Sequence, residues 1–148
     1  MKHSRMMAAA AALLLVAGAV QAKVEPAGMF KRVEGEVRVE RAGATLPASV
    51  GMALYATDTV VTGSGGSAGI TFDDNTLMSL GPASRLAINQ FRFNSTTHEG
   101  RFESTLSKGR LAVVSGKIAK HEQDAMKVRT PSSVLGVRGT EFIVEAGE

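Results

Sequence analysis

The sequence predicts an all-β domain behind a short apolar N-terminal segment, and three observations support this prediction. Apolar and polar residues alternate in short runs such as Val37-Arg38-Val39, which is the two-residue period of a strand with one buried face. Clusters of glycine, proline, asparagine and serine separate these runs and are typical of turns. No window of about twelve residues carries a convincing apolar stripe at helical spacing.

The first 22 residues are expected to be a cleavable export signal. Lys2 and Arg5 form a basic start, residues 6–20 form an apolar run, and Ala22 ends a small-residue cleavage site. At about 1.5 Å per residue the apolar run would reach only about 22 Å as a helix, short of the ~30 Å hydrocarbon core of a bilayer. We therefore expect cleavage after Ala22 and a chain that lies in the periplasm or is secreted, with no membrane span after signal cleavage.

The remaining chain, residues 23–148, reads as a succession of strands and turns. Strand-like runs include residues 33–39, 70–72, 86–88, 91–93, 111–113, 126–128 and 142–144, and turn signals include residues 42–44, 62–67, 73–75, 81–82, 94–97, 108–109, 115–116 and 130–131. We expect at most one short helical turn, within residues 117–126. The pattern predicts one domain of many short antiparallel strands and leaves open a β-sandwich or jelly roll, a small barrel and a short β-solenoid.

Charge and composition exclude several classes of function. The formal net charge of +3 falls to +1 once Lys2 and Arg5 are removed, which disfavours a nucleic-acid surface. Phe91-Arg92-Phe93 has the residues to stack bases, but strand alternation produces the same spacing. The chain has no cysteine, so disulfides and thiolate sites are excluded.

Two short motifs resemble catalytic or metal sites. Gly65-Gly66-Ser67-Ala68-Gly69 matches the nucleophile elbow of hydrolases, but a strand-like run follows it where that elbow requires a helix. Asp73-Asp74-Asn75 resembles the start of a calcium loop, but the required glycine and distal glutamate are missing, so a hairpin turn is the preferred interpretation. His98 and His121 stand apart in polar surroundings. We predict no enzyme, no cofactor and no metal.

The run from Thr130 to Phe142 is the most constrained part of the chain. Arg138 stands between Gly136-Val137 and Gly139-Thr140, and a guanidinium packed among glycines needs carboxylate or carbonyl partners. Asp58, Asp73 and Asp74 are the candidate carboxylates, and with Arg138 and Thr140 they make up the predicted structural or partner-contact residues. Two interpretations stay open: a contact with a ligand or partner protein, and an ion pair that holds the last strands.

Several segments together resemble the FecR domain family, a periplasmic module of signal-transducing regulators and of exported stand-alone proteins. The resemblance spans roughly residues 33–144 and rests on Gly35-Glu36-Val37-Arg38-Val39 and on residues 50–63, 68–77, 80–86, 106–111, 128–131 and 136–142. Asp74-Asn75 stands where the family usually has an Asp-Gly turn. FecR regulators also carry an anti-sigma segment and a transmembrane helix ahead of this domain, where this chain has the expected signal.

The resemblance implies an all-β periplasmic binding, signalling or adaptor module that acts through a protein partner and has no known catalytic activity. Without an anti-sigma segment, such a chain is not expected to contact a sigma factor itself. The alternative is a structural or adhesive envelope protein that binds polysaccharide or peptidoglycan.

Export can be tested on protein recovered from the compartment outside the cytoplasm. We expect its N-terminus to be Lys23, as read by N-terminal sequencing and intact mass. Ala22→Arg removes the small residue that the cleavage site requires, so this variant is expected to keep residues 1–22. Recovery of wild-type protein that begins at Met1 would contradict the prediction.

Overall fold

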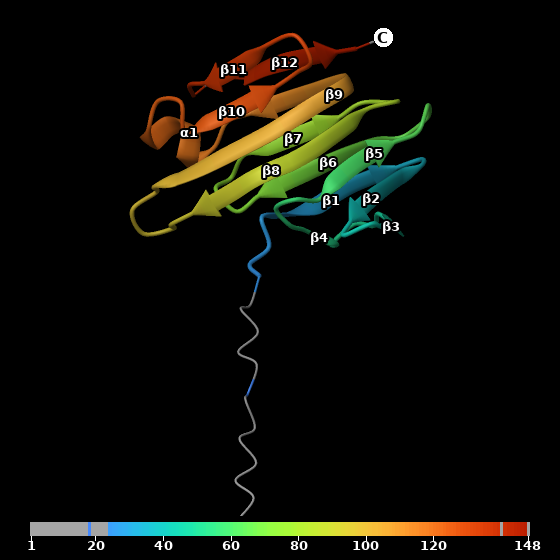
Figure 1. Ribbon diagram of the computed structural model, residues 1–148, viewed down its shortest axis with the longest axis horizontal. Coiled ribbons are helices and arrows are strands. Elements are labelled where there is room, and N and C mark those ends of the chain that lie inside the picture. The colour runs from blue at the N-terminus through green and yellow to red at the C-terminus, as the bar shows by residue number, and fades with distance from the viewer. Residues whose placement is uncertain (1–17, 19–23, 140, 148) are drawn as a thin grey trace, which may run out of the picture.

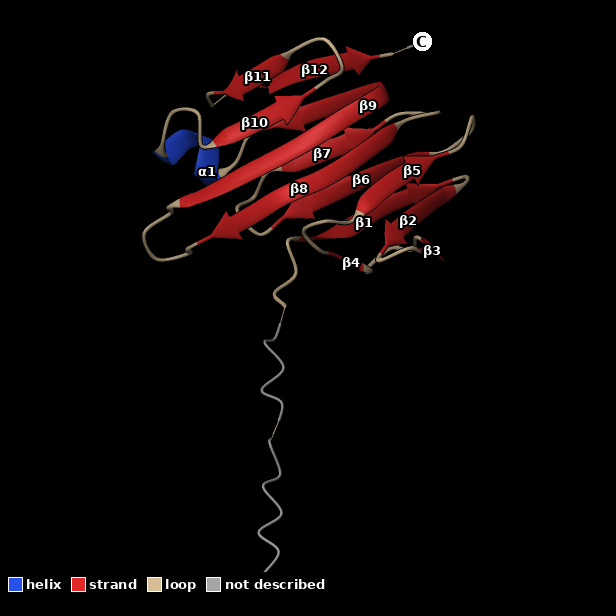
Figure 2. Ribbon diagram, in the orientation of Figure 1, coloured by secondary structure: helices blue, strands red, loops and turns tan. Residues whose placement is uncertain are grey.

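The computed structural model describes residues 18, 24–139 and 141–147, and this part of the chain is nearly all strand (Figure 2). Twelve strands and one short helix follow one another (Figure 1). The strands are β1 (Gly28–Glu34), β2 (Val37–Arg41), β3 (Ala44–Pro47), β4 (Ala53–Leu54), β5 (Thr59–Thr62), β6 (Ser67–Phe72), β7 (Leu77–Leu80), β8 (Arg85–Phe93), β9 (Gly100–Val114), β10 (Met126–Arg129), β11 (Val134–Val137) and β12 (Glu141–Ala146). The all-β prediction is confirmed, and the predicted export signal lies outside the described residues except for Gly18.

The strands form two layers that share one strand. Sheet I has the order β3-β2-β5-β8-β9-β10-β11, and sheet II has the order β4-β1-β6-β7-β9-β12. The fold is therefore a sandwich made from one curled sheet, which is one of the arrangements that the sequence left open. The pairing of β9 with β10 is parallel, so the prediction of antiparallel strands fails at this one pair.

The parallel pair follows from the path of the chain after β9. Parallel neighbours require a crossover connection. Here it passes through the helix α1 (Lys117–His121), which lies where the sequence predicted a short helical turn. The side chain of Ile118 packs directly beside Gly100, the first residue of β9. The chain thus returns to the start of β9 before β10 begins, and Met126 pairs with Phe102.

β9 passes from one sheet to the other at Lys108 and Gly109. Lys108 is opposite Arg85 of β8 in sheet I, whereas Gly109 is opposite Ala146 of β12 in sheet II. Gly109 has a φ of 97°, and the side chain of Ser84 fills the space that a β-carbon would take. Ser84 is buried, and its hydroxyl accepts a hydrogen bond of 3.0 Å from the Arg110 amide. A residue without a side chain is therefore required at the bend.

Alternating side chains from both sheets fill the space between the layers. Three phenylalanines mark its centre: the ring of Phe102 lies 4.6 Å from that of Phe72 and 5.0 Å from that of Phe91, between centroids. The largest fully buried side chains are Phe30, Phe72, Phe102, Leu54, Ile70, Met78, Leu80, Leu86, Ile88, Leu106, Leu111 and Ile118. Each contributes about 1.5–3 kcal/mol by leaving water.

Two glycine substitutions test the bend in β9. Gly43 and Gly109 both have positive φ, but nothing lies within 4 Å of a β-carbon at Gly43. Gly43→Ala is expected to lower the free energy of unfolding by about 1 kcal/mol through backbone strain alone. Gly109→Ala adds a clash with Ser84 and is expected to cost about 2–4 kcal/mol in total. Equal losses in urea unfolding would show that the contact with Ser84 does not shape the bend.

Candidate functional site

The carboxylate of Asp58 forms a structural ion pair with Arg41. The Asp58 side chain is 1% exposed and accepts hydrogen bonds of 2.9 and 2.7 Å from Nε and Nη2 of Arg41. It also accepts one of 2.9 Å from the amide of Tyr55, whose ring lies 4.7 Å from the Arg41 guanidinium carbon. The hydrogen bond to Asp58 raises the pKa of Arg41 above its ordinary value. This pair ties β2 to the segment between β4 and β5, so Asp58 is not the partner of Arg138.

Asp74 joins the β6–β7 turn to the start of α1. Its buried carboxylate accepts hydrogen bonds from the hydroxyl of Thr76 at 2.8 Å and from the amide of Ile118 at 3.3 Å. Its carbonyl accepts from the amide of Lys117 at 2.8 Å. The Thr76 hydroxyl in turn accepts from the amide of Gly116 at 3.1 Å. Asp74 is thus held by local partners and does not pair with Arg138.

Asp73 lies in an exposed hairpin turn, as the sequence predicted for residues 73–75. The amide of Phe72 donates to the Thr76 carbonyl and the amide of Asn75 donates to the Phe72 carbonyl, both at 2.9 Å. Asn75 has a φ of 70°, a conformation that asparagine tolerates. Partial desolvation raises the pKa of Asp73, and the charges of Asp74 and Glu25 raise it further. The turn explains the acidic triplet without calcium.

The remaining sequence motifs lie within strands and loops. Ser67 begins β6, and its hydroxyl contacts Glu34 at 3.4 Å. Arg92 is exposed between Phe91 and Phe93, which are half-buried against the core, so strand alternation explains this motif. His98 stacks on Phe93 in the β8–β9 loop with the ring centroids 6.1 Å apart. Across residues 24–139 and 141–147, no group of three or more metal-ligating side chains comes together.

Arg138 lies in the connection between β11 and β12, and it is exposed. Thr140 lies outside the described residues. Of the carboxylates that the sequence offered to Arg138, Asp58 and Asp74 are bound elsewhere and Asp73 belongs to the β6–β7 turn. Arg138 instead lines a hollow of about 300 Å³. The interpretation as an ion pair with one of these three aspartates therefore loses its support.

The hollow beside Arg138 is an opening between the last strands of the two sheets. β11 pairs only with β10 and β12 pairs only with β9 among the described strands, and both lie at the same end of the molecule (Figure 1). The residues that line the hollow are Leu135, Gly136, Val137, Arg138, Phe142 and Ile143. Leu135 and Phe142 belong to the inward rows of their strands, but Leu135 is still 37% exposed because no further strand covers it.

Apolar side chains continue from this opening onto the outer face of sheet II. The strand registers place Leu77 and Val114 side by side in one row, with Met29 beyond Thr71 in the same row and with Ala112 and Ile143 in the next row. Ile143 is 58% exposed and Leu77 is 44% exposed. A second hollow of about 590 Å³ lies between β7, β9 and β12, and Ile143 lines both hollows.

The chemistry of this surface suits binding. Aliphatic and aromatic side chains dominate it, and Glu141 and Arg138 stand at its margins. The outer edges of β11 and β12 have no strand partner among the described residues. Contiguous exposed apolar residues with a polar rim are typical of protein interaction sites. We name the opening and its walls (Leu135, Gly136, Val137, Arg138, Phe142 and Ile143) the β11–β12 opening.

Sequence reasoning singled out Arg138 but missed the apolar part of the opening. Leu135, Phe142 and Ile143 alternate as core residues do, and only the pairing of the strands shows that they lie at an edge. Strand alternation predicts a run at residues 142–144 but none at residues 134–137, so the sequence does not predict two neighbouring edge strands. Alternation alone does not reveal which strands lack a neighbour.

The raised pKa of Asp73 gives a prediction about stability against pH. A carboxyl whose pKa is higher in the folded state stabilises the fold while protonated and loses that contribution as pH rises through the folded pKa. Asp73→Asn should therefore be slightly more stable than the wild type at pH 7, by less than about 1 kcal/mol because solvent screens an exposed site. In urea unfolding the difference should vanish near pH 3. Glu99→Gln, in an exposed loop, is the control, and a destabilised Asp73→Asn at pH 7 would contradict the assignment.

Comparison with known proteins gives one match. The family model described as FecR protein matches residues 58–148, from the residue before β5 to the last residue of the chain. No curated protein and no solved structure matches the chain significantly. The match leaves out residues 33–57, which the sequence resemblance included, although β1 to β4 belong to the same two sheets as the matched part.

None of the helices in the described residues has the length and apolar character needed to cross a membrane. The family match covers more than half of the chain, and it includes both walls of the β11–β12 opening. This protein therefore belongs to the FecR family.

Proposed function

We propose that this protein is an exported, non-enzymatic module that binds a protein partner in the periplasm and takes part in signalling. The FecR family is a family of regulatory and signalling domains, which supports the general class. The observation that carries the proposal is the β11–β12 opening, where core-type side chains and two strand edges are exposed together. The expected export signal supports the location.

The opening has the features of a contact centre. Ile143 and Leu135 are large aliphatic side chains that a partner would remove from water, and each fully buried side chain of this kind contributes about 1.5–3 kcal/mol. Arg138 stands at the margin, where a guanidinium can make directed hydrogen bonds to a partner carboxylate or carbonyl. A buried apolar centre with a charged margin is the usual anatomy of a protein interface.

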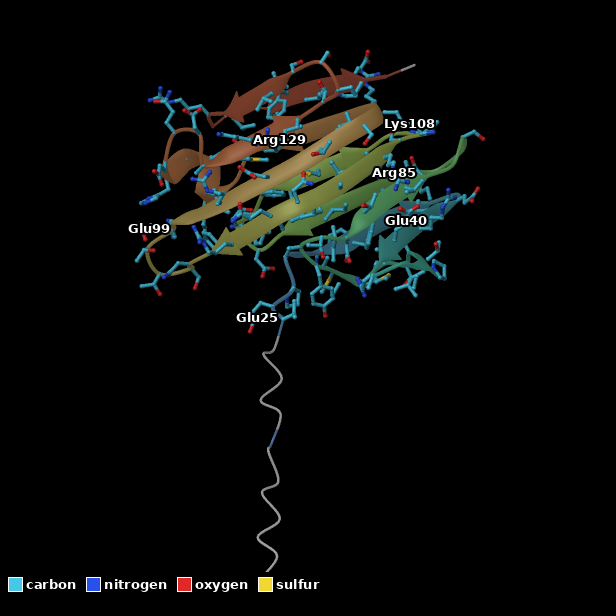
Figure 3. The ribbon with its side chains drawn as sticks, viewed as in Figure 1. Glu25, Glu40, Arg85, Glu99, Lys108 and Arg129 are labelled. Carbon is cyan, nitrogen blue, oxygen red and sulfur yellow. The ribbon has the colours of Figure 1, made fainter. Side chains whose placement is uncertain are left out.

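A second candidate function, binding of an anionic envelope polymer, has one observation in its favour. The outer face of sheet I carries Arg101, Lys127 and Arg129 around the single carboxylate of Glu103. Arg101 and Arg129 approach Glu103 to 3.6 and 3.9 Å, so one acid is shared between them. Figure 3 places Arg129 on this face.

The other charged pair labelled on this face is balanced. Arg85 donates hydrogen bonds of 3.1 and 2.6 Å to the two carboxylate oxygens of Glu40, and this lowers the pKa of Glu40. The two residues come from β8 and β2 and lie close together in Figure 3. The pair of Arg85 and Glu40 thus adds no net positive charge to this face, which is why we rank this function second.

Site-directed photo-crosslinking in envelope extract tests the first function. A diazirine amino acid at Ile143 is expected to give one protein adduct of defined mass, and the same group at Asn89, on the outer face of sheet I, is expected to give none. Val50 is 64% exposed in the loop before β4, so Val50→Thr is a matched control for Ile143→Thr. With the diazirine at Leu135, Ile143→Thr should reduce capture roughly tenfold because a central aliphatic contact is lost, and Val50→Thr should not change it.

The alternatives give different results. Loss of cosedimentation with wall polymer after Arg129→Ala and Lys127→Ala, with no protein adduct at Ile143, would favour the polymer-binding function. Equal adducts at Ile143 and Asn89 would contradict a defined site at the opening.

A further inference from the structure

The free edge of β12 has a specific charge pattern. The outward row of this strand reads Glu141, Ile143, Glu145, and the inward row reads Phe142, Val144, Ala146. Glu145 lies 3.5 Å from Arg110, with both side chains mostly exposed, and Glu141 has no ion pair with any other described residue. An aliphatic residue therefore stands between two carboxylates along an edge whose backbone groups face solvent.

The edge of β12 is a better docking edge than that of β11. β12 spans six residues and β11 spans four. On the outer face of β11, the carboxylate of Asp124 occupies the space beside Gly136, so the chain itself already covers this part of the face. On the outer face, the outward row of β12 is flanked by Val114, Ala112 and Arg110 of β9, which lie on the side away from the free edge.

A second copy of this chain fits the β12 edge poorly. In a twofold antiparallel pair centred on Ile143, Glu141 of each copy would be opposite Glu145 of the other, and like charges directly opposite destabilise a strand pair. Centring the pair on Val144 or on Phe142 places Ile143 opposite a glutamate. Shifting the second copy by a single residue would turn its inward row, Phe142, Val144 and Ala146, to the outer face. The charge pattern thus favours a strand whose sequence differs from that of β12.

We propose that the partner binds as an extended segment that adds a strand to the free edge of β12. This inference rests on the proposed function. On the outer face this segment carries a branched aliphatic residue opposite Ile143 and a lysine or arginine opposite both Glu141 and Glu145. Its two intervening residues are apolar and enter the β11–β12 opening between Leu135 and Phe142. Backbone hydrogen bonds hold the segment, and the alternating side chains select it.

The recognised pattern is basic, apolar, aliphatic, apolar, basic. It reads the same in both directions, so it suits a parallel or an antiparallel segment. The added strand covers two features that the described chain leaves open, namely the edge of sheet II and the inward faces of Leu135 and Phe142.

Synthetic peptides test this inference on the full chain. The probe is fluorescein-labelled Thr-Lys-Val-Ile-Val-Lys-Thr, with blocked termini, and binding is followed by fluorescence anisotropy at low salt. We expect the probe to bind at least ten times more tightly than the same peptide with both lysines replaced by glutamate. A probe with proline in place of the central isoleucine should not bind, because proline removes a backbone donor and does not fit the ladder.

A charge exchange provides the decisive control. The double variant Glu141→Lys, Glu145→Lys is expected to lose the lysine probe and to gain the glutamate probe. Glu99→Lys with Glu122→Lys changes the net charge equally at exposed positions outside the opening, and it should keep the wild-type preference. Hydrogen exchange should show slower exchange in β12 on binding and unchanged exchange in β3 at the opposite edge of the sandwich.

Two outcomes would overturn the inference. Equal binding of the lysine, glutamate and proline probes would exclude strand pairing. The proposed function would still stand if the diazirine at Ile143 gave its protein adduct, and it would fail if it did not. A concentration-dependent dimer in sedimentation that Ile143→Thr weakens and Val50→Thr does not would assign the edge to a second copy of the chain.

Discussion

The passage of β9 through both sheets is the constraint on which the rest of the sandwich depends. Its first part pairs with β8 and β10, and its second part pairs with β7 and β12, so four strands take their position from it. The bend between these parts requires a backbone with positive φ at Gly109 and the hydroxyl of Ser84 beside it. One glycine and one serine thus determine where the two layers separate and, through them, where the β11–β12 opening lies.

The sequence was sufficient to predict the fold class because strand periodicity and turn chemistry are local. The hairpin at Asp73 to Asn75 and the short helical turn after Gly116 follow from such local signals, and the structure has both. The strand order depends on contacts between residues far apart in the chain, which periodicity does not encode. The parallel pairing of β10 with β9 was therefore missed, since it arises from the crossover through α1.

The candidate site was predictable to a smaller extent, and the reason is also physical. Arg138 stood out because a guanidinium among glycines needs a partner, but three aspartates were chemically equivalent in sequence. Arg41 precedes Asp58 by seventeen residues, and the pairing of β2 with β5 brings the two together. Leu135 and Phe142 look like core residues in sequence, and they are only partly covered because their strands lie at the edges of the sheets.

The shared strand also affects how this protein opens. Because β9 belongs to both layers, unfolding of either sheet removes the partners of part of this strand and so weakens the other sheet. The sandwich should therefore behave as a single cooperative unit, whereas local opening is restricted to the outermost strands. A binding site at such an outer strand can rearrange at little cost, because the hydrogen-bond network of the interior does not have to change.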